Sequence, residues 1–218
     1  MIAHKNKILA CITISAVFLI SACALAEELK PIELSKPDLE RGRSLMQALK
    51  ERKSNREFSE KEIPLDIISN LLWAASGVNR PDSGNITVPS AHNWQEIDIY
   101  VAMQKGLYLY NTKKHILEPV MVKDIREFTG IQSFTQAAPV SLIYVADFSR
   151  MGGYTEEGDF YSATDTGFIS QNVYLFCASE GLSTVVLGWV DRPALSKAMS
   201  LRDDQKIILT QPVGYPKE

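Results

Sequence analysis

A short stretch near the amino end gathers the residue types that bind phosphate. The sequence RKSNREF at 52–58 places Arg52, Lys53 and Arg56 around Ser54. Guanidinium and ammonium groups form charge-assisted hydrogen bonds with phosphate oxygens, and the serine adds a hydroxyl donor. The stretch therefore predicts a site for a phosphate monoester, while a solvated basic turn of the same composition is the alternative.

A second stretch offers amide groups in place of charges. The sequence PSAHNWQ starts at Pro89 and carries Ser90, Asn93 and Gln95 just before an expected strand. Amide side chains present both donors and acceptors, which suit the edge of a flat heterocycle. The alternative is a hydrogen-bonded turn that holds no ligand.

A third stretch, LGWVD, contains Gly188, whose missing side chain lets a backbone approach a ligand closely. A tight turn without a ligand explains the same glycine. Trp94 and Trp189 stand in the second and third stretches. We expect these two rings either to flank a pocket or to pack in the core.

Several common catalytic motifs are absent from the 218 residues. The chain has no Gly-rich dinucleotide fingerprint, no Walker sequence and no G-x-S-x-G elbow. Downstream of Cys23 the chain holds only Cys177, His92 and His115, so a metal centre built on these residues is not expected. Acidic residues outnumber basic ones by 26 to 23, which argues against nucleic acid as a partner.

The first residues have the pattern of an export signal. A lysine-containing start precedes an apolar run at 8–20 that is short for a bilayer span. The sequence ISAC, ending at Cys23, resembles a lipobox, and the ALA that ends at Ala26 is a small-x-small cleavage site. We therefore expect residues 1–26 to direct export to a bacterial periplasm, with a lipid anchor at Cys23 or cleavage after Ala26. An uncleaved anchoring helix is the remaining alternative.

The elements that position these stretches follow from residue spacing and turn residues. A polar linker is expected at 27–37, a loop at 78–95 and an acidic loop at 147–160. Helices are expected from Asp38, from Pro64 to Gly77, within 122–130, at 163–180 and at 193–199. Strands are expected at 96–103, 106–110, 113–120, 139–146, 183–190 and 205–214. Helices and strands do not alternate regularly, which favours an α+β fold over a doubly wound sheet.

In their order and spacing, the three stretches resemble the nitroreductase family of FMN-dependent oxidoreductases. RKSNREF looks like the family's Arg-x-Ser-x-Arg loop, and PSAHNWQ looks like its Pro-Ser-x-x-Asn-x-Gln loop. Residues 165–189 are similar to its central interface helix and the Gly turn that follows, and PVGYP fits its last strand. The likeness covers about Asp38 to Glu218. It is nearest to the shorter branch, which includes peptide-azoline dehydrogenases of the streptolysin-synthesis type.

The resemblance implies a domain over 38–218 with a central mixed or antiparallel sheet, flanked by helices, in a homodimer with two interfacial FMN sites. The first loop would hold the phosphate and ribityl chain, with Lys217 as a further basic ligand. The second loop would come from the other subunit, and the Gly turn would face the ring near N5. The residues so assigned to FMN are Arg52, Lys53, Ser54, Arg56, Pro89, Ser90, Ala91, Asn93, Gln95, Leu187, Gly188 and Lys217.

The implied reaction is a ping-pong hydride transfer through flavin N5, to or from a small organic substrate, so no catalytic side chain and no metal are expected. Many relatives carry an acidic residue where Leu187 stands. The electron donor, NAD(P)H or another reductant, is therefore left open. Two other classes fit the same scaffold: a flavin- or ligand-binding protein without turnover, and a surface interaction domain.

Overall fold

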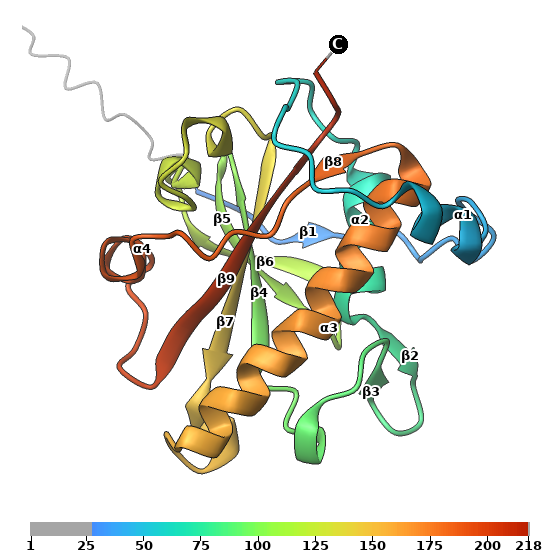
Figure 1. Cartoon of the computed structure of the whole chain (residues 1–218). Helices are drawn as coiled ribbons and strands as arrows, with labels where there is room; N and C mark the ends of the chain where they lie inside the picture. Colours follow the sequence, from blue (N-terminus) through green and yellow to red (C-terminus); the bar gives the residue numbers. More distant parts are fainter. Residues whose placement is uncertain (1–27, 218) are drawn as a thin grey trace, which may run out of the picture.

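The computed structural model describes residues 28–217, and seven of their strands form one sheet (Figure 1). Across the sheet the order is β1 (Ile32–Glu33), β6 (Ile116–Met121), β5 (Gly106–Asn111), β4 (Ile97–Met103), β7 (Val140–Asp147), β9 (Gln205–Gly214) and β8 (Ser183–Thr184). Every neighbouring pair is antiparallel. The α+β expectation is confirmed, and the sheet is antiparallel throughout.

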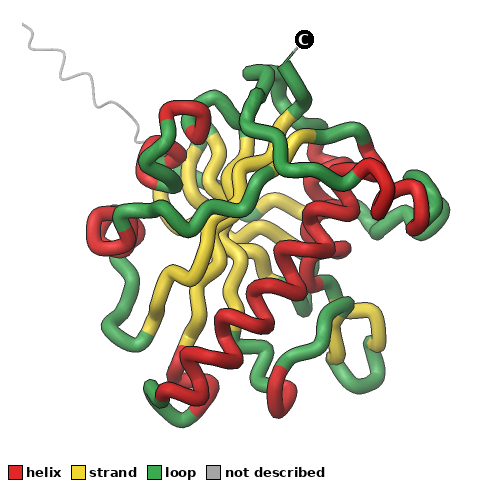
Figure 2. The backbone as a smooth tube through the Cα atoms, viewed as in Figure 1, coloured by secondary structure: helices red, strands yellow, loops and turns green. Residues whose placement is uncertain are grey.

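Helices lie on both faces of this sheet. α2 (Leu65–Ser76) and the long α3 (Glu156–Glu180) pack together across one face, and α1 (Leu45–Glu51) packs on α3 (Figure 2). α4 (Arg192–Met199) lies on the other face with two short 3₁₀ turns, η2 (Arg126–Phe128) and η3 (Ser133–Thr135). The remaining elements are the hairpin of β2 (Val78–Arg80) with β3 (Asn85–Ile86), and the turns η1 (Ala91–Asn93) and η4 (Phe148–Met151).

Strand β7 separates two hydrophobic cores. All eight of its residues are buried, as its nearly continuous apolar sequence predicts for a sheet centre. Leu142 and Tyr144 belong to the core under α2 and α3, whereas Ile143 and Val145 belong to the core under α4. Because side chains alternate along a strand, this one segment anchors both helical layers.

Helix α3 begins earlier than its sequence pattern predicts. The expected start at Ala163 and the expected loop over 147–160 are wrong, since the helix begins at Glu156. The Thr155 hydroxyl accepts a hydrogen bond from the Gly158 N–H at 2.9 Å, and the acidic residues of the first turn favour a helix amino end. The expected end at Gly181 is confirmed, because this residue adopts a left-handed conformation with φ of 71°.

The segments before the first helix also differ from expectation. The helix expected from Asp38 starts only at Leu45, because Gly42 has a φ of 92° and the Ser44 side chain caps the first turn. The segment expected as a linker at 27–37 supplies β1, in which Ile32 pairs with Leu117. Ile32 and Glu33 are thereby part of the sheet.

Two further stretches have less regular secondary structure than predicted, and a third has more. The helix expected within 122–130 is only the single turn η2, and the strand expected at 183–190 is reduced to the two residues of β8. The loop at 78–95 instead holds the β2–β3 hairpin and η1. The second helix has the predicted bounds, with Pro64 before it and Gly77 after it.

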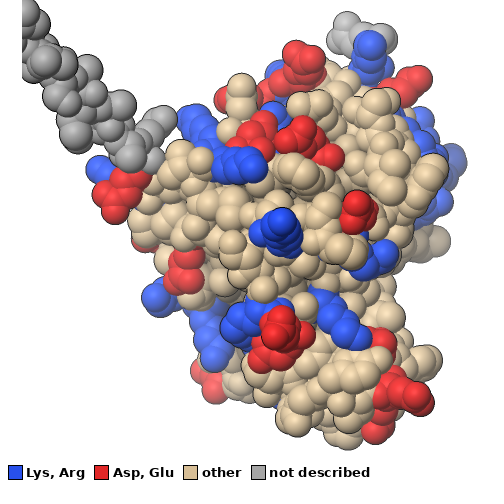
Figure 3. Space-filling model, turned by 90° about the vertical axis from the view of Figure 1, so that its left-hand side faces the viewer, with Lys and Arg blue, Asp and Glu red and all other residues tan. Residues whose placement is uncertain are grey.

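The expectations that concern the leader fall on residues 1–26, outside the described part of the chain. Within residues 28–217, none of the helices combines the length and apolar character needed to cross a membrane. On the face drawn in Figure 3, basic and acidic side chains are interspersed, without an extended patch of one sign.

Candidate functional site

The loop that follows α1 is fixed to the sheet through one residue. The Asn55 N–H donates to the Thr184 carbonyl at 3.0 Å, and its side-chain amide donates to the Ser183 hydroxyl at 2.8 Å. The neighbouring residues Ser54 and Arg56 remain exposed. Asn55, which sequence reasoning did not single out, is therefore the anchor of the predicted phosphate loop.

The cations of this loop are unpaired in the described structure. No carboxylate of residues 28–217 lies within ion-pair distance of Arg52, Lys53 or Arg56. Lys217, also without an ion pair among these residues, is held beside the loop because its backbone N–H donates to the Glu57 carbonyl at 3.4 Å. Four basic side chains thus come from two distant parts of the chain.

Lys53, one of the predicted phosphate ligands, lines a cavity that the other ligands of its loop do not line. Lys53 and Asn55 line a cavity of about 440 Å³ together with Tyr174 and Thr184, whereas Arg52, Ser54 and Arg56 are not part of its lining. Successive side chains of an extended segment point to opposite sides. The structure therefore groups Arg52, Ser54 and Arg56 and sets Lys53 apart from them.

The second predicted loop has a strained backbone. His92, Asn93 and Gln95 have φ values of 51°, 56° and 49°, a left-handed conformation that is uncommon for residues other than glycine. The Gln95 amide bridges to the Asn93 side chain at 2.9 Å and to the Gly84 carbonyl at 3.3 Å. Such strain is typical of functional loops, and hydrogen bonds hold this one in place.

Two acidic residues that sequence reasoning missed, Glu96 and Asp165, accept hydrogen bonds from this loop. Ser90 accepts from the Gln95 N–H at 2.8 Å and donates to Glu96 at 3.2 Å, while the Ala91 N–H donates to Asp165 of α3 at 2.9 Å. Glu96 is fully buried, and one of its carboxyl oxygens has no partner among the described residues. Burial raises the pKa of Glu96, and the nearby charge of Asp165 raises it further, against the opposing effect of hydrogen bonds from its own N–H and Ser90.

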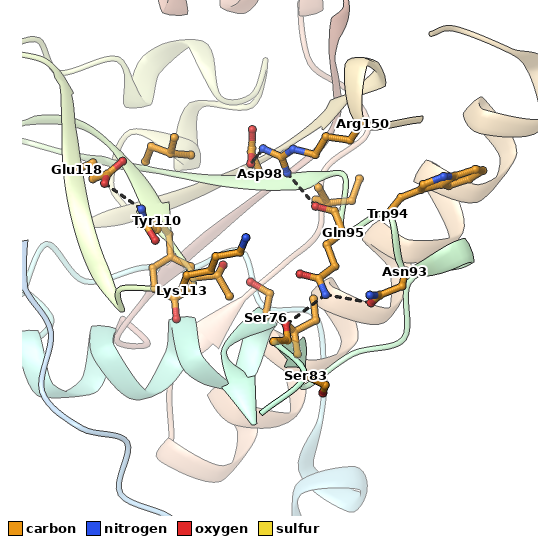
Figure 4. A pocket seen from close by; sticks show the side chains of 16 residues that line it. Ser76, Ser83, Asn93, Trp94, Gln95, Asp98, Tyr110, Lys113, Glu118 and Arg150 are labelled. Carbon is orange, nitrogen blue, oxygen red and sulfur yellow. Dashed lines mark hydrogen bonds and ion pairs between the residues drawn. The ribbon is translucent and has the colours of Figure 1, made fainter. Parts of the chain in front are cut away.

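The side chains of this loop also form one wall of a cavity of about 540 Å³ (Figure 4). Asn93, Trp94 and Gln95 face residues at the ends of β4, β5 and β6 there. Arg150 closes the wall, since it donates to the Gln95 carbonyl at 2.8 Å and to Asp98 at 2.6 Å. These contacts fix the second predicted loop to strand β4 through Arg150.

The first free backbone donor of the Gly turn belongs to Gly188. Both backbone groups of Leu187 are paired with Thr210, at 2.8 and 3.1 Å, and the Leu187 side chain is buried in the core under α4. Gly188 is exposed, and its N–H donates to no group of residues 28–217. Arg192 steadies the turn by donating to the carbonyl of Gly188 at 3.2 Å and to two carbonyls of β9.

The two tryptophans have different surroundings. Trp189, beside the Gly turn, is 65% exposed, so a place in the core is wrong for this ring. Trp94 is half-buried and stacks near His92, with ring centroids 4.6 Å apart, and against Tyr161 of α3 at 6.1 Å. The ring of Trp94 is thus part of the loop's own packing.

The two predicted loops lie on opposite sides of α3. The first contacts Tyr174, through a hydrogen bond of 2.8 Å between the Ser54 and Tyr174 hydroxyls, and the second contacts Asp165. Residues nine positions apart on a helix are half a turn out of phase and about 13 Å apart along the axis. Figure 1 shows the loop after α1 and the turn η1 near opposite ends of α3. One chain therefore does not bring the two loops together.

Comparison with known proteins places the chain in a family. The sequence model of the nitroreductase family matches residues 49–215, so the chain belongs to the nitroreductase family, whose members are oxidoreductases that typically bind FMN. The predicted resemblance is confirmed.

Individual proteins support the same assignment. A Methanocaldococcus jannaschii protein named as a nitroreductase is 29% identical over 194 residues, which span 84% of this chain and 96% of that protein. The crystal structure of a Ralstonia eutropha JMP134 protein, also named as a nitroreductase, is similar with a TM-score of 0.84 and 41% identity, over 89% of this chain and 93% of that one. The Vibrio harveyi NADPH:FMN oxidoreductase, complexed with NAD⁺, shares the fold at a TM-score of 0.62 and 16% identity, over 80% of this chain and 69% of that one.

Proposed function

We propose that the protein is an exported FMN-dependent oxidoreductase that moves a hydride between a donor and a small organic substrate. The observation that supports this most is the group of unpaired donors after α1. Exposed cations without carboxylate partners, beside a serine hydroxyl, match the charge and the oxygens of a phosphate monoester. The family assignment selects FMN among phosphate monoesters.

The described residues fit FMN at both ends. Arg52, Ser54 and Arg56, with Lys217 beside them, would hold the phosphate and ribityl chain. The free N–H of Gly188 would donate to the ring near N5. When bound, FMN supplies hydride acceptance and donation at N5. The chain's own contribution would be to bind and orient the cofactor, so the reaction needs no catalytic acid–base pair from the three stretches.

The separation of the two loops in one chain supports our proposal of a homodimer. In a second copy, Pro89, Ser90, Ala91, Asn93 and Gln95 would approach the flavin that the first copy holds through its phosphate. The solvent side of α3 supports this, since Phe160 is 66% exposed and Phe168 is 43% exposed, with the exposed Gly167 between them. Large exposed apolar side chains beside a small residue favour close packing of a partner.

Our proposals for the place of action and the electron donor rest on the leader and the Gly turn. The pattern of residues 1–26 supports export, with lipid attachment at Cys23 or cleavage after Ala26. The Leu187 side chain is apolar and buried, so it offers no charge to a nicotinamide. We propose a donor other than free NAD(P)H, since that cofactor is a cytoplasmic reductant.

Flavin titration tests the proposal. Wild-type protein is expected to be yellow and to bind FMN, while Arg52→Ala loses about ten- to a hundredfold in affinity through one lost charge-assisted pair. Lys197→Ala, which removes an exposed cation from the distant α4, is the matched control and should bind FMN as wild type does. Unchanged affinity in Arg52→Ala contradicts the assignment.

A turnover measurement separates the enzyme from a binding protein on the same scaffold. Dithionite should bleach the bound flavin, and a quinone or nitroaromatic should restore its absorbance. Bound FMN that no acceptor reoxidises would indicate a flavin-binding protein without turnover.

A further inference from the structure

Tyr174 connects the two parts of the flavin site that lie within one chain. This residue lies in the carboxyl-terminal half of α3 and is half-buried. Its phenol oxygen is 2.8 Å from the Ser54 hydroxyl and accepts the Val186 N–H at 2.9 Å. Val186 lies two residues before Gly188. Tyr174 therefore contacts both the predicted phosphate loop and the segment that leads to the Gly turn.

The difference in burial between Tyr174 and Ser54 favours one direction for the hydrogen bond that joins them. The phenol carries one hydrogen, and its oxygen already accepts from Val186. If Ser54 also donated to it, the phenol hydrogen would have no partner within the described chain. Either direction leaves one hydroxyl hydrogen without a partner among residues 28–217, and this costs less on the exposed Ser54 than on the half-buried Tyr174. We therefore infer that Tyr174 donates to the Ser54 oxygen, which leaves the hydrogen of Ser54 free to point outward, toward an anion.

The ring of Tyr174 contacts a second phosphate ligand. The guanidinium carbon of Arg52 lies 5.4 Å from the ring centroid, a distance at which a cation is attracted to an aromatic face. Arg52 has no carboxylate partner in residues 28–217, so this ring is the contact that orients it. One side chain thus orients both the hydroxyl and the guanidinium.

We propose that Tyr174 is a positioning residue for the cofactor phosphate, which acts by aiming the Ser54 hydroxyl and the Arg52 guanidinium. This inference rests on the proposed FMN function. A purely structural role, in which Tyr174 only fills space between α3 and β8, would affect every flavin equally. Riboflavin has the same ring and side chain as FMN without the phosphate, so comparison of the two ligands separates these roles.

The decisive experiment is titration of Tyr174→Phe with FMN and with riboflavin. The variant keeps the ring under Arg52 and removes only the hydroxyl. We expect FMN affinity to fall about three- to tenfold, as for one lost hydrogen bond, and riboflavin affinity to stay within about twofold of wild type. Tyr154→Phe, which removes an exposed hydroxyl bonded to Asp159, is the matched control and should change neither affinity.

A double-variant cycle tests the proposed route through Ser54. In a Ser54→Ala background, Tyr174→Phe should have little further effect on FMN affinity, because the hydroxyl that it orients is gone. Equal loss of FMN and riboflavin, no loss of either, or additive effects of the two substitutions would overturn the role of Tyr174. Wild-type protein that binds neither flavin would instead overturn the proposed function, and this inference with it.

Discussion

Leu187 pairs with Thr210 through both its N–H and its carbonyl, in a single bridge between the segment after β8 and strand β9. The next residue, Gly188, has left this bridge, and its N–H is the first one after it without a partner in the described chain. The bridge therefore fixes the position at which a backbone donor becomes available. The resemblance names both residues, and the structure assigns the free donor to Gly188 alone.

Gly188→Ala should leave the fold intact and weaken flavin binding. A methyl group at this position would meet only the Leu209 side chain, at 3.8 Å, and the backbone has no positive φ. We expect the free energy of unfolding to stay equal or to rise by about 0.4–1 kcal/mol. FMN affinity should fall about tenfold or more, because the methyl occupies space that the ring needs. Unchanged affinity would contradict a close approach of the flavin.

Gly181→Ala, at the end of α3, should instead destabilise the fold and leave flavin binding unchanged. This glycine has a φ of 71° and open space around it, so an alanine there is strained rather than crowded. We expect the free energy of unfolding to fall by about 1 kcal/mol, with FMN affinity unchanged. Chemical denaturation and flavin titration of both glycine variants check the pair.

Phe168→Glu should dissociate the proposed homodimer and thereby weaken flavin binding. Phe168 lies on the solvent side of α3, where a charge would be buried against the partner. Sedimentation should show a monomer, and FMN affinity should fall by more than about tenfold because the second loop no longer reaches the site. Val122→Glu, at an exposed position after β6, is the matched control and should remain dimeric. A monomeric wild-type protein with full FMN affinity would contradict the prediction.

Glu96→Gln should change how stability depends on pH. The folded chain raises the pKa of Glu96 above its ordinary value of 4.5, so the folded state prefers the protonated form. As pH rises from about 4.5 to the raised pKa, the unfolded chain releases this proton first, and wild-type stability falls. Glutamine is neutral at every pH and still accepts from Ser90. The stability advantage of the variant should therefore grow across this range and then level off, as measured by denaturant unfolding. A stability difference between variant and wild type that stays constant with pH would contradict the raised pKa of Glu96.

Cys177 should be unreactive in the folded protein. Cys177 belongs to α3 and its side chain is buried, and burial raises the pKa of the thiol, so little reactive thiolate forms at neutral pH. In protein purified without residues 1–26, a thiol reagent is expected to label Cys177 only after guanidinium chloride is added. Rapid labelling of the native protein would show that α3 opens readily.

Local signals predicted those parts of the fold whose cause is local. Pro64 and Gly77 bound α2 as expected, and the apolar run of β7 lies at the sheet centre. The start of α3 was missed because the acidic residues of its first turn look like a solvated loop when the cap at Thr155 is not recognised. Strand β1 was missed because its pairing with β6 joins residues far apart in the sequence, which no local pattern shows.

The sequence by itself determined which chemical groups the site has: three cations around a serine, an amide-rich loop and a glycine turn, in the order typical of nitroreductases. Only the tertiary structure decided which of these groups are available. Asn55 is used to anchor its loop, Lys53 lines a cavity that Arg52, Ser54 and Arg56 do not line, and Leu187 has no free backbone group. The physical reason is that the type of a group is local, whereas its hydrogen-bond partners come from distant segments that only folding brings together.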